Sequence, residues 1–83
     1  MTEKDIFLSD ISRLHTTELG AVRIMKNLGI TEEPVQFCKK IILLDDCNIF
    51  RQGKNWYCEA DDIIITINAH SFTIITAHKT RRT

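Results

Sequence analysis

Residues 63–79, which read IIITINAHSFTIITAHK, decide the fold of this chain. Two runs of β-branched and aromatic residues, 63–67 and 72–75, are separated by the segment AHS. Such runs favour strands, and their alternation gives each strand one side that can be buried. Because strands joined by so short a connection must pair antiparallel, the stretch predicts an antiparallel hairpin.

The same pattern extends upstream to residue 48. Ile49 and Phe50, followed by Trp56 and Tyr57, form two further short runs, which the segments GKN and ADD bound. Residues 48–79 therefore predict four short strands in an antiparallel meander. Because successive strand residues face opposite sides, one of Trp56 and Tyr57 is expected in the core and the other at the surface.

The connection of the last hairpin decides which side chains share a face. It lacks the glycine that two-residue turns usually need, so we prefer a three-residue loop of Ala69, His70 and Ser71, in which Asn68 faces Phe72. The core face is then expected to hold Ile63, Ile65, Ile67, Ile75 and Ala77. The accessible face is expected to hold Ile64, Thr66, Asn68, Phe72, Ile74, Thr76 and His78. A slip of one residue would exchange these roles on one strand.

Before residue 45 the apolar residues recur at helical spacing. The predicted helices span residues 5–14, 17–28 and 32–43. Thr16 or Thr17 can cap the second helix and Gly29 can end it, while Thr31 can cap the third ahead of Pro34. Their apolar stripes are Phe7, Leu8, Ile11 and Leu14, then Leu19, Ala21, Val22, Ile24, Met25 and Leu28, then Val35, Cys38, Ile41 and Ile42. Gly20 predicts either close packing or a frayed start of the second helix.

The predicted fold class is α+β, with two to three N-terminal helices packed on one face of a four-stranded antiparallel meander. We expect a single domain over residues 1–83, with its helical part in 5–43 and its sheet in 48–79. Residues 80–83, with two arginines, are expected to form a loose basic tail.

Composition excludes several classes of function. Eleven basic and eleven acidic side chains cancel, so the chain lacks the positive field that attracts nucleic acid from a distance, and any nucleic-acid site must be local. No segment approaches the roughly 18 consecutive apolar residues of a membrane span, and the N-terminus lacks a signal pattern, so a cytoplasmic location without a membrane partner is expected. The odd set Cys38, Cys47 and Cys58 lacks a C-x-x-C pair and predicts free thiols without a metal.

No phosphate-binding glycine-rich loop and no spaced metal-ligand set is present, so no cofactor is expected. A set of acid–base groups remains. Metal-free RNA cleavage needs a base, an acid and a cation near the phosphate, and His15, His78 and Arg23 are the catalytic candidates. The candidates for holding substrate are Lys54, Tyr57, Asn68 and Thr76.

Each of these residues also has a plainer explanation. A histidine beside a helix start often only satisfies a local hydrogen bond, and one near a chain end is often simply exposed. Lys54 follows Gly53 in a tight turn, where polar residues are expected whatever the function. An exposed Tyr57 is the residue that can stack on a base.

Four segments carry a resemblance to a known family. They are LHTTELG at 14–20, the R-I-x-x-N-L-G pattern at 23–29, GKNWY at 53–57 and ITINAHSFTIITAHK at 65–79. Together they resemble an uncharacterised family of short bacterial proteins, domain of unknown function 3781, over residues 14–79. This family has no assigned activity, so the resemblance implies no function.

The order of elements is more distantly similar to the RelE, colicin and barnase-like ribonuclease superfamily. That similarity implies an RNA-cleaving site between the open sheet face and the preceding helix. The chain departs from the superfamily pattern, because Asn27 and Leu28 stand where relatives have a basic residue before Gly-Ile, and because it has no net positive charge.

Three functions stay open at this point. The first is a small metal-independent ribonuclease or toxin-like domain, and the second is a non-catalytic module that binds nucleic acid or a protein partner. The third is an accessory subunit that self-associates through its sheet face, as a homodimer would. The position of His15, Arg23 and His78 distinguishes them, because catalysis requires these three side chains to meet at one cleft.

Overall fold

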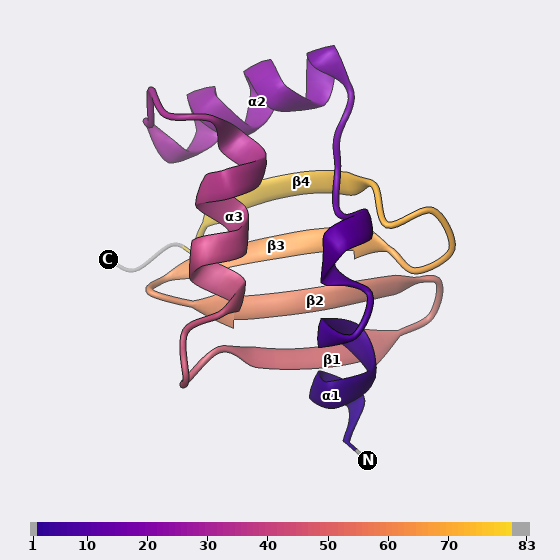
Figure 1. The fold of residues 1–83 in the computed structure, drawn as a ribbon. Coiled ribbons are helices and arrows are strands. Elements are labelled where there is room, and N and C mark those ends of the chain that lie inside the picture. The colour runs from indigo at the N-terminus through magenta and orange to yellow at the C-terminus, as the bar shows by residue number, and fades with distance from the viewer. Residues whose placement is uncertain (1, 81–83) are drawn as a thin grey trace.

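The computed structural model describes residues 2–80, and within them three α-helices precede a four-stranded antiparallel sheet (Figure 1). The helical elements are α1 (Glu3–Leu8), the 3-10 turn η1 (Ile11–Arg13), α2 (Glu18–Leu28) and α3 (Pro34–Ile42). The strands are β1 (Asn48–Gln52), β2 (Asn55–Ala60), β3 (Ile63–Asn68) and β4 (Ile74–Lys79), side by side in that order. The predicted α+β class and the antiparallel meander are confirmed.

All the helices lie on one face of the sheet (Figure 1). The core fills the space between them, and its largest fully buried side chains are Phe7, Ile24, Ile42, Ile65, Ile67, Ile74, Cys38 and Cys58. The rings of Phe7 and Trp56 meet edge to face at 5.3 Å, and Phe7 stacks on Phe72 at 5.1 Å. Phe7 therefore ties the N-terminal helix to β2 and to the loop between β3 and β4.

The first predicted helix is shorter than expected and is followed by a separate turn. Thr2 caps α1, because its hydroxyl accepts from the Asp5 amide at 3.1 Å and its own amide faces the Asp5 carboxylate at 3.4 Å. The helix ends at Leu8, and the hydroxyl of the next residue, Ser9, donates a hydrogen bond to the Ile6 carbonyl at 2.7 Å. Such side-chain bonds to the backbone compete with helix continuation, so residues 11–13 form only a 3-10 turn.

The caps of α2 are those that the sequence predicts, whereas that of α3 is not. The Thr17 hydroxyl accepts from the Gly20 amide at 3.0 Å, and Gly29 ends α2 in the left-handed conformation at φ 67°. The cap of α3 is Glu33, whose carboxylate accepts from two first-turn amides. Pro34 is then the first helical residue, where its missing amide costs nothing. The predicted Thr31 cap and the start at residue 32 are wrong.

The buried stripe of α2 is narrower than predicted. Gly20, Ile24 and Leu28 are buried, whereas Leu19 is 73% exposed and Val22 is 64% exposed. A Cβ on Gly20 would overlap the hydroxyl of Thr16, which donates to the Ile74 carbonyl at 3.1 Å. Gly20 therefore permits close packing of the α2 start against β4, one of the two predicted outcomes.

The last hairpin differs from the prediction by its loop and by a bulge. The Asn68 amide donates to Thr73 at 2.9 Å, and Phe72 turns back at φ 59° to donate to Asn68 at 2.8 Å, so the loop is longer than three residues. Thr66 pairs with Thr76 but Ile67 pairs with Ile74, which leaves Ile75 as the extra residue of a bulge.

This bulge exchanges three side chains between the faces. Phe72 and Ile74, expected on the accessible face, are buried, and Ile75, expected in the core, is 43% exposed. The stack of Phe72 on Phe7 gives the physical reason, because burying an aromatic ring outweighs the strain of one left-handed residue. The predicted three-residue loop is therefore wrong.

No helix within residues 2–80 is both long and apolar enough to cross a membrane. The basic tail expected at residues 80–83 lies outside the described residues except for Thr80. The Thr80 amide donates to the Asp62 carbonyl at 2.8 Å, which holds the end of β4 against the turn between β2 and β3.

Candidate functional site

One face of the sheet carries no helix within the described residues, and we call it the uncovered face (Figure 1). The strand registers place on it Asn48, Phe50, Gln52, Asn55, Tyr57, Glu59, Ile64, Thr66, Asn68, Thr76 and His78. Thr66 and Thr76 are cross-strand partners, as are Ile64 and His78. The face is thus mostly polar, with Phe50, Tyr57 and Ile64 as its apolar groups, and of the apolar residues predicted there only Ile64 remains, because Phe72 and Ile74 are buried in the core.

Two aromatic rings stand side by side on the uncovered face. Phe50 of β1 pairs with Tyr57 of β2, and their rings stack with centroids 5.5 Å apart at 22°. The side-chain NH₂ group of Asn55 lies 3.4 Å from the Tyr57 hydroxyl. Both rings are half-buried, whereas the neighbouring Trp56 is buried on the opposite face, as strand alternation requires. The sequence pattern identified Tyr57 but not its partner Phe50.

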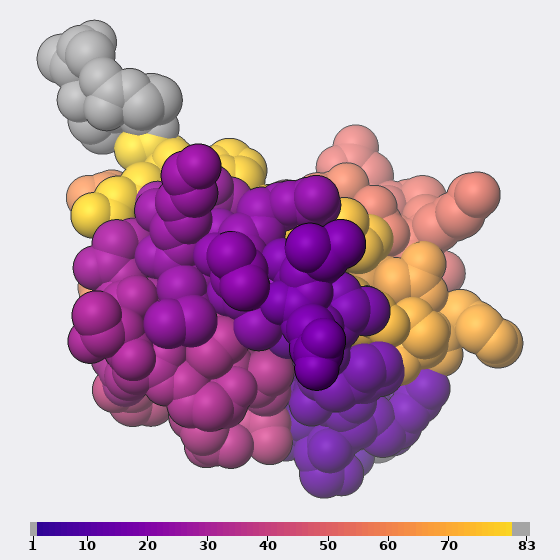
Figure 2. All heavy atoms as spheres, turned by 90° about the horizontal axis from the view of Figure 1, so that it is seen from above, coloured from indigo at the N-terminus to yellow at the C-terminus, as the bar shows by residue number. Residues whose placement is uncertain are grey.

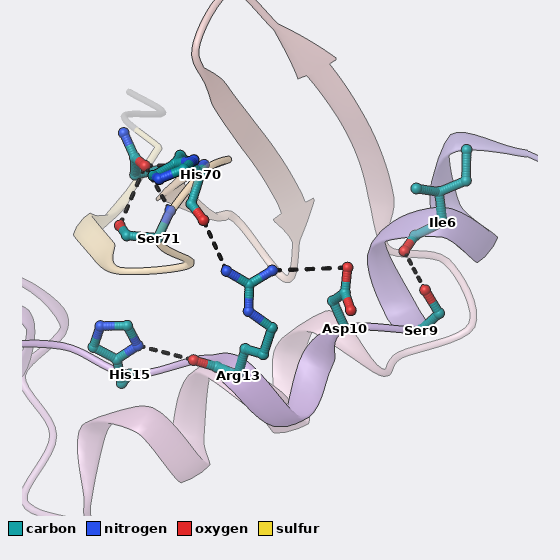
Figure 3. A network of polar contacts seen from close by, with 8 residues as sticks. Ile6, Ser9, Asp10, Arg13, His15, His70 and Ser71 are labelled. Atoms are coloured by element: carbon teal, nitrogen blue, oxygen red, sulfur yellow. Dashed lines mark hydrogen bonds and ion pairs between the residues drawn. The ribbon is translucent and has the colours of Figure 1, made fainter.

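His15 lies at the beginning of β4. It forms an isolated parallel bridge with Thr73, in which its carbonyl accepts from the Ile74 amide at 2.7 Å. Its ring is held by the Arg13 carbonyl at 2.8 Å from Nδ1 and by the Thr73 hydroxyl at 3.1 Å from Nε2. Figure 3 shows the His15 ring turned toward Arg13. Both ring nitrogens therefore already have partners.

His78 lies near the other end of the same strand. It pairs with Ile64, whereas Thr73, the partner of His15, faces Asn68, so the two positions are four residues of β3 or about 13 Å apart at roughly 3.3 Å per residue. Its side chain is exposed on the uncovered face, and its Nδ1 lies 3.3 Å from the Lys79 carbonyl. The structure therefore does not bring His15 and His78 together at one phosphate-sized space.

Arg23 is exposed on α2, one turn before Asn27. The side-chain NH₂ group of Asn27 donates to the Ala77 carbonyl at 3.3 Å, so this flank of α2 lies along β4. No hydrogen bond or ion pair joins the Arg23 guanidinium to any residue within the described range 2–80. The catalytic roles of His15, Arg23 and His78 stay predictions.

The structure does bring Lys54 and Asn68 together. The β1–β2 turn and the β3–β4 loop lie at the same end of the sheet, and the Ala69 amide donates to the Lys54 carbonyl at 2.9 Å. Between them lies a surface hollow of about 390 Å³ that is open to solvent, which we call the loop-end cavity. Its lining consists of Arg51, Gly53, Lys54, Asn68, Ala69 and His70. Figure 2 shows this turn and this loop projecting beyond the helices.

Sequence reasoning missed Arg51 and His70 as candidate residues. The sequence pattern places His70 only in the loop of the last hairpin and gives Arg51 no role. The signal that was present is the meander itself. Its first and third connections must lie at the same end of the sheet, so their polar residues are neighbours.

The wall of the cavity is braced from η1. Arg13 donates to the His70 carbonyl at 2.7 Å and lies 3.9 Å from the Asp10 carboxylate, so its guanidinium spans the two (Figure 3). The same guanidinium lies over the Phe72 ring at 4.9 Å. The Asn68 side-chain oxygen accepts from the His70 and Ser71 amides at 3.0 and 2.9 Å. The loop is therefore held by its own side chains as well as by the helical segment.

The three cysteines are buried free thiols, as predicted. Burial, assisted by the nearby Glu33 carboxylate, raises the pKa of Cys38 to about 12. A hydrogen bond from the Cys58 thiol lowers the pKa of Cys47, and the same bond together with burial raises that of Cys58. Within residues 2–80, no three side chains of His, Cys, Asp or Glu gather as a metal site would require. The thiols therefore belong to the core.

Comparison with known proteins identifies the family and nothing finer. Neither a search of curated proteins nor a search of solved structures finds a match, so the resemblance to the RelE, colicin and barnase-like superfamily has no support from them. A family model described as "Protein of unknown function (DUF3781)" matches residues 8–78. This match covers most of the 83 residues, and the chain therefore belongs to the DUF3781 family.

Proposed function

We propose that this protein is a non-catalytic module that binds single-stranded RNA on the uncovered face of its sheet. The observation that carries the proposal is the stacked pair Phe50 and Tyr57 on a sheet face without a helix. Single-stranded RNA offers unpaired bases to aromatic side chains, and each such stack contributes about 1–3 kcal/mol. Tyr57 is half-exposed toward this side and supplies the ring on which a base stacks.

Polar groups beside the rings supply the remaining contacts. Thr76 and His78 follow one another on the outward side of β4, and Asn68 ends the neighbouring strand. These side chains can hydrogen-bond to base edges or to 2′-hydroxyl groups, which distinguish RNA from DNA. Lys54 at the end of the sheet contacts phosphate. Because the chain has no net charge, few phosphates are neutralised and the salt dependence of binding is shallow.

The separation of the two histidines favours binding over cleavage. An acid and a base that act on one phosphodiester must both reach it within hydrogen-bond distance or through one water. His15 is bound to Arg13 and Thr73 at the start of β4, and His78 is about 13 Å along that strand. The distance between the two histidines argues against an acid–base pair, and so do the ring nitrogens of His15, which are both already hydrogen-bonded.

The test is fluorescence anisotropy of a labelled unstructured RNA of about a dozen nucleotides. Tyr57→Ala should weaken binding about 5- to 150-fold, the loss expected for one stacked base. Tyr57→Phe keeps the ring and should bind nearly as well as the native protein. Val22→Ala, on the exposed side of α2, is the matched control and should bind unchanged.

Two results would overturn the proposal. One is equal RNA affinity of the native protein and Tyr57→Ala, with both shown to be folded by circular dichroism. The other is a homodimer in light scattering that Tyr57→Arg dissociates, because the uncovered face would then be the interface of an accessory subunit.

A further inference from the structure

We propose that the loop-end cavity is a binding site for a phosphomonoester group. This site lies apart from the stacked rings but shares Lys54 and Asn68 with the proposed RNA-binding face, so the Tyr57→Ala variant is needed to separate the two. Its volume of about 390 Å³ lies in the range of small-molecule sites, which begins at roughly 300 Å³.

The charge of the lining selects an anion. Arg51, Lys54 and His70 contribute basic side chains, and no acidic residue lines the cavity. The ion pairs within residues 2–80 are Arg13 with Asp10 and Lys40 with Glu32. The Glu3 carboxylate lies 3.4 Å from the Arg51 backbone amide, but no ion pair joins a described carboxylate to the Arg51 guanidinium or to Lys54. Basic groups that share a concave surface without acids repel one another, and a bound anion relieves that repulsion.

The donors of the lining are also available. The Arg51 Nε donates to the Gly53 carbonyl at 3.0 Å, which orients the guanidinium and leaves its two terminal nitrogens for a ligand. That guanidinium also lies over the Trp56 ring at 5.8 Å. The Asn68 oxygen is occupied by loop amides, so its NH₂ group remains as a donor.

The arrangement is held before any ligand arrives. The Ala69 amide joins the loop to the Lys54 carbonyl at 2.9 Å, the Asn68 amide closes the loop onto Thr73 at 2.9 Å, and Arg13 holds the His70 carbonyl at 2.7 Å. A fixed guanidinium binds two phosphate oxygens at once, and the lysine serves as a point charge for a third. A carboxylate has only two oxygens for this set of donors, so a phosphomonoester matches it better.

The phosphomonoester has two sources, a free mononucleotide or the end of an RNA strand, and the experiment separates them. Amide NMR spectra are recorded during titration with inorganic phosphate and then with adenosine monophosphate, at constant ionic strength. Saturable shifts are expected at Gly53, Lys54, Ala69 and His70. Arg51→Gln and Lys54→Gln should each weaken binding about tenfold or more, as expected when a hydrogen bond to a charged group is lost.

Lys26→Gln removes an exposed lysine of α2 and is the matched control, which should bind like the native protein. Tighter binding of a 5′-phosphorylated RNA than of its 5′-hydroxyl form, lost in Lys54→Gln, would assign the strand end. Equal binding of the two RNAs together with saturation by the mononucleotide would assign the free ligand.

Unsaturable shifts spread over all exposed basic residues would overturn the site, as would equal affinity of native protein and both glutamine variants. The Tyr57→Ala protein should keep the phosphate shifts, so failure of RNA binding on the uncovered face is distinguishable from failure of this site.

Discussion

His15 and Thr73, which are 58 residues apart in the chain, are joined through both backbone and side chain. The Arg13 carbonyl only accepts, so His15 Nδ1 carries the proton that points to it, and in the neutral imidazole Nε2 then accepts from the Thr73 hydroxyl. The Thr73 oxygen also lies 2.7 Å from the Ser71 hydroxyl. This link fastens the segment before α2 to the edge of the sheet.

Thr73→Val should therefore destabilise the fold. It keeps the β-branched shape and removes the hydroxyl that His15 and Ser71 share, so the free energy of unfolding should fall by about 1 kcal/mol. Urea denaturation followed by circular dichroism measures the loss. His78→Ala changes an exposed side chain on the same strand and should stay within about 0.5 kcal/mol of the native protein. Equal stability of the two variants would contradict a structural role of the His15–Thr73 bond.

Gly20→Ala should destabilise the protein although alanine is the better helix former. The added methyl group would overlap the Thr16 hydroxyl and lie 3.2 Å from that of Thr17. Displacing the Thr16 hydroxyl breaks its bond to the Ile74 carbonyl, and overpacking costs about 1–3 kcal/mol against a gain in helix propensity of about 1 kcal/mol.

The comparison with Thr16→Ala tests this cause. In that background the overlapping hydroxyl is absent, so Gly20→Ala should cost clearly less and can become stabilising. A thermal or urea double-mutant cycle over the two positions gives the coupling energy, and a coupling near zero would show that Thr16 is not the obstacle.

Cys38 should make the fold sensitive to alkaline pH. Its pKa is about 12 in the folded protein and near 9.0 in the unfolded chain. Below pH 9 both states hold the proton, and the thiol gives no pH dependence. Between pH 9 and 12 only the unfolded chain loses the thiol proton. The free energy of unfolding therefore falls with rising pH, by at most about 1.4 kcal/mol per pH unit. Cys38→Ala should show a shallower alkaline slope than the native protein, and identical slopes would contradict this.

The fold could be predicted from the sequence because the change from helical to alternating period lies at one place. Apolar stripes with Thr17 and Gly29 as caps define α2, and the short connections after residue 47 permit only antiparallel strands. These are local signals, and they need no knowledge of contacts between distant residues. The element order and the pairing of neighbouring strands follow from them.

The register of the last hairpin could not be predicted, because a contact distant in sequence decides it. Phe72 enters the core to stack on Phe7, and Ile75 becomes the extra residue of a bulge. The candidate site was likewise predictable only where local pattern decides the position of a residue. Tyr57, Asn68, Thr76 and His78 follow from strand alternation, whereas His15 is placed by its bond to Thr73, and Arg51 enters the cavity through the three-dimensional meeting of two turns.

The purified protein should leave RNA intact in the presence and in the absence of a chelator. The reason is the distance along β4. His15 and His78 lie about 13 Å apart along the strand, so they cannot reach one phosphodiester together as base and acid. The measurement is gel electrophoresis of total RNA and of the labelled oligonucleotide after incubation, with His15→Ala and His78→Ala proteins purified in parallel. His78→Ala should lower RNA affinity and keep the native melting curve. Cleavage that both substitutions abolish would contradict the non-catalytic proposal and would require a bound state in which the two imidazoles meet.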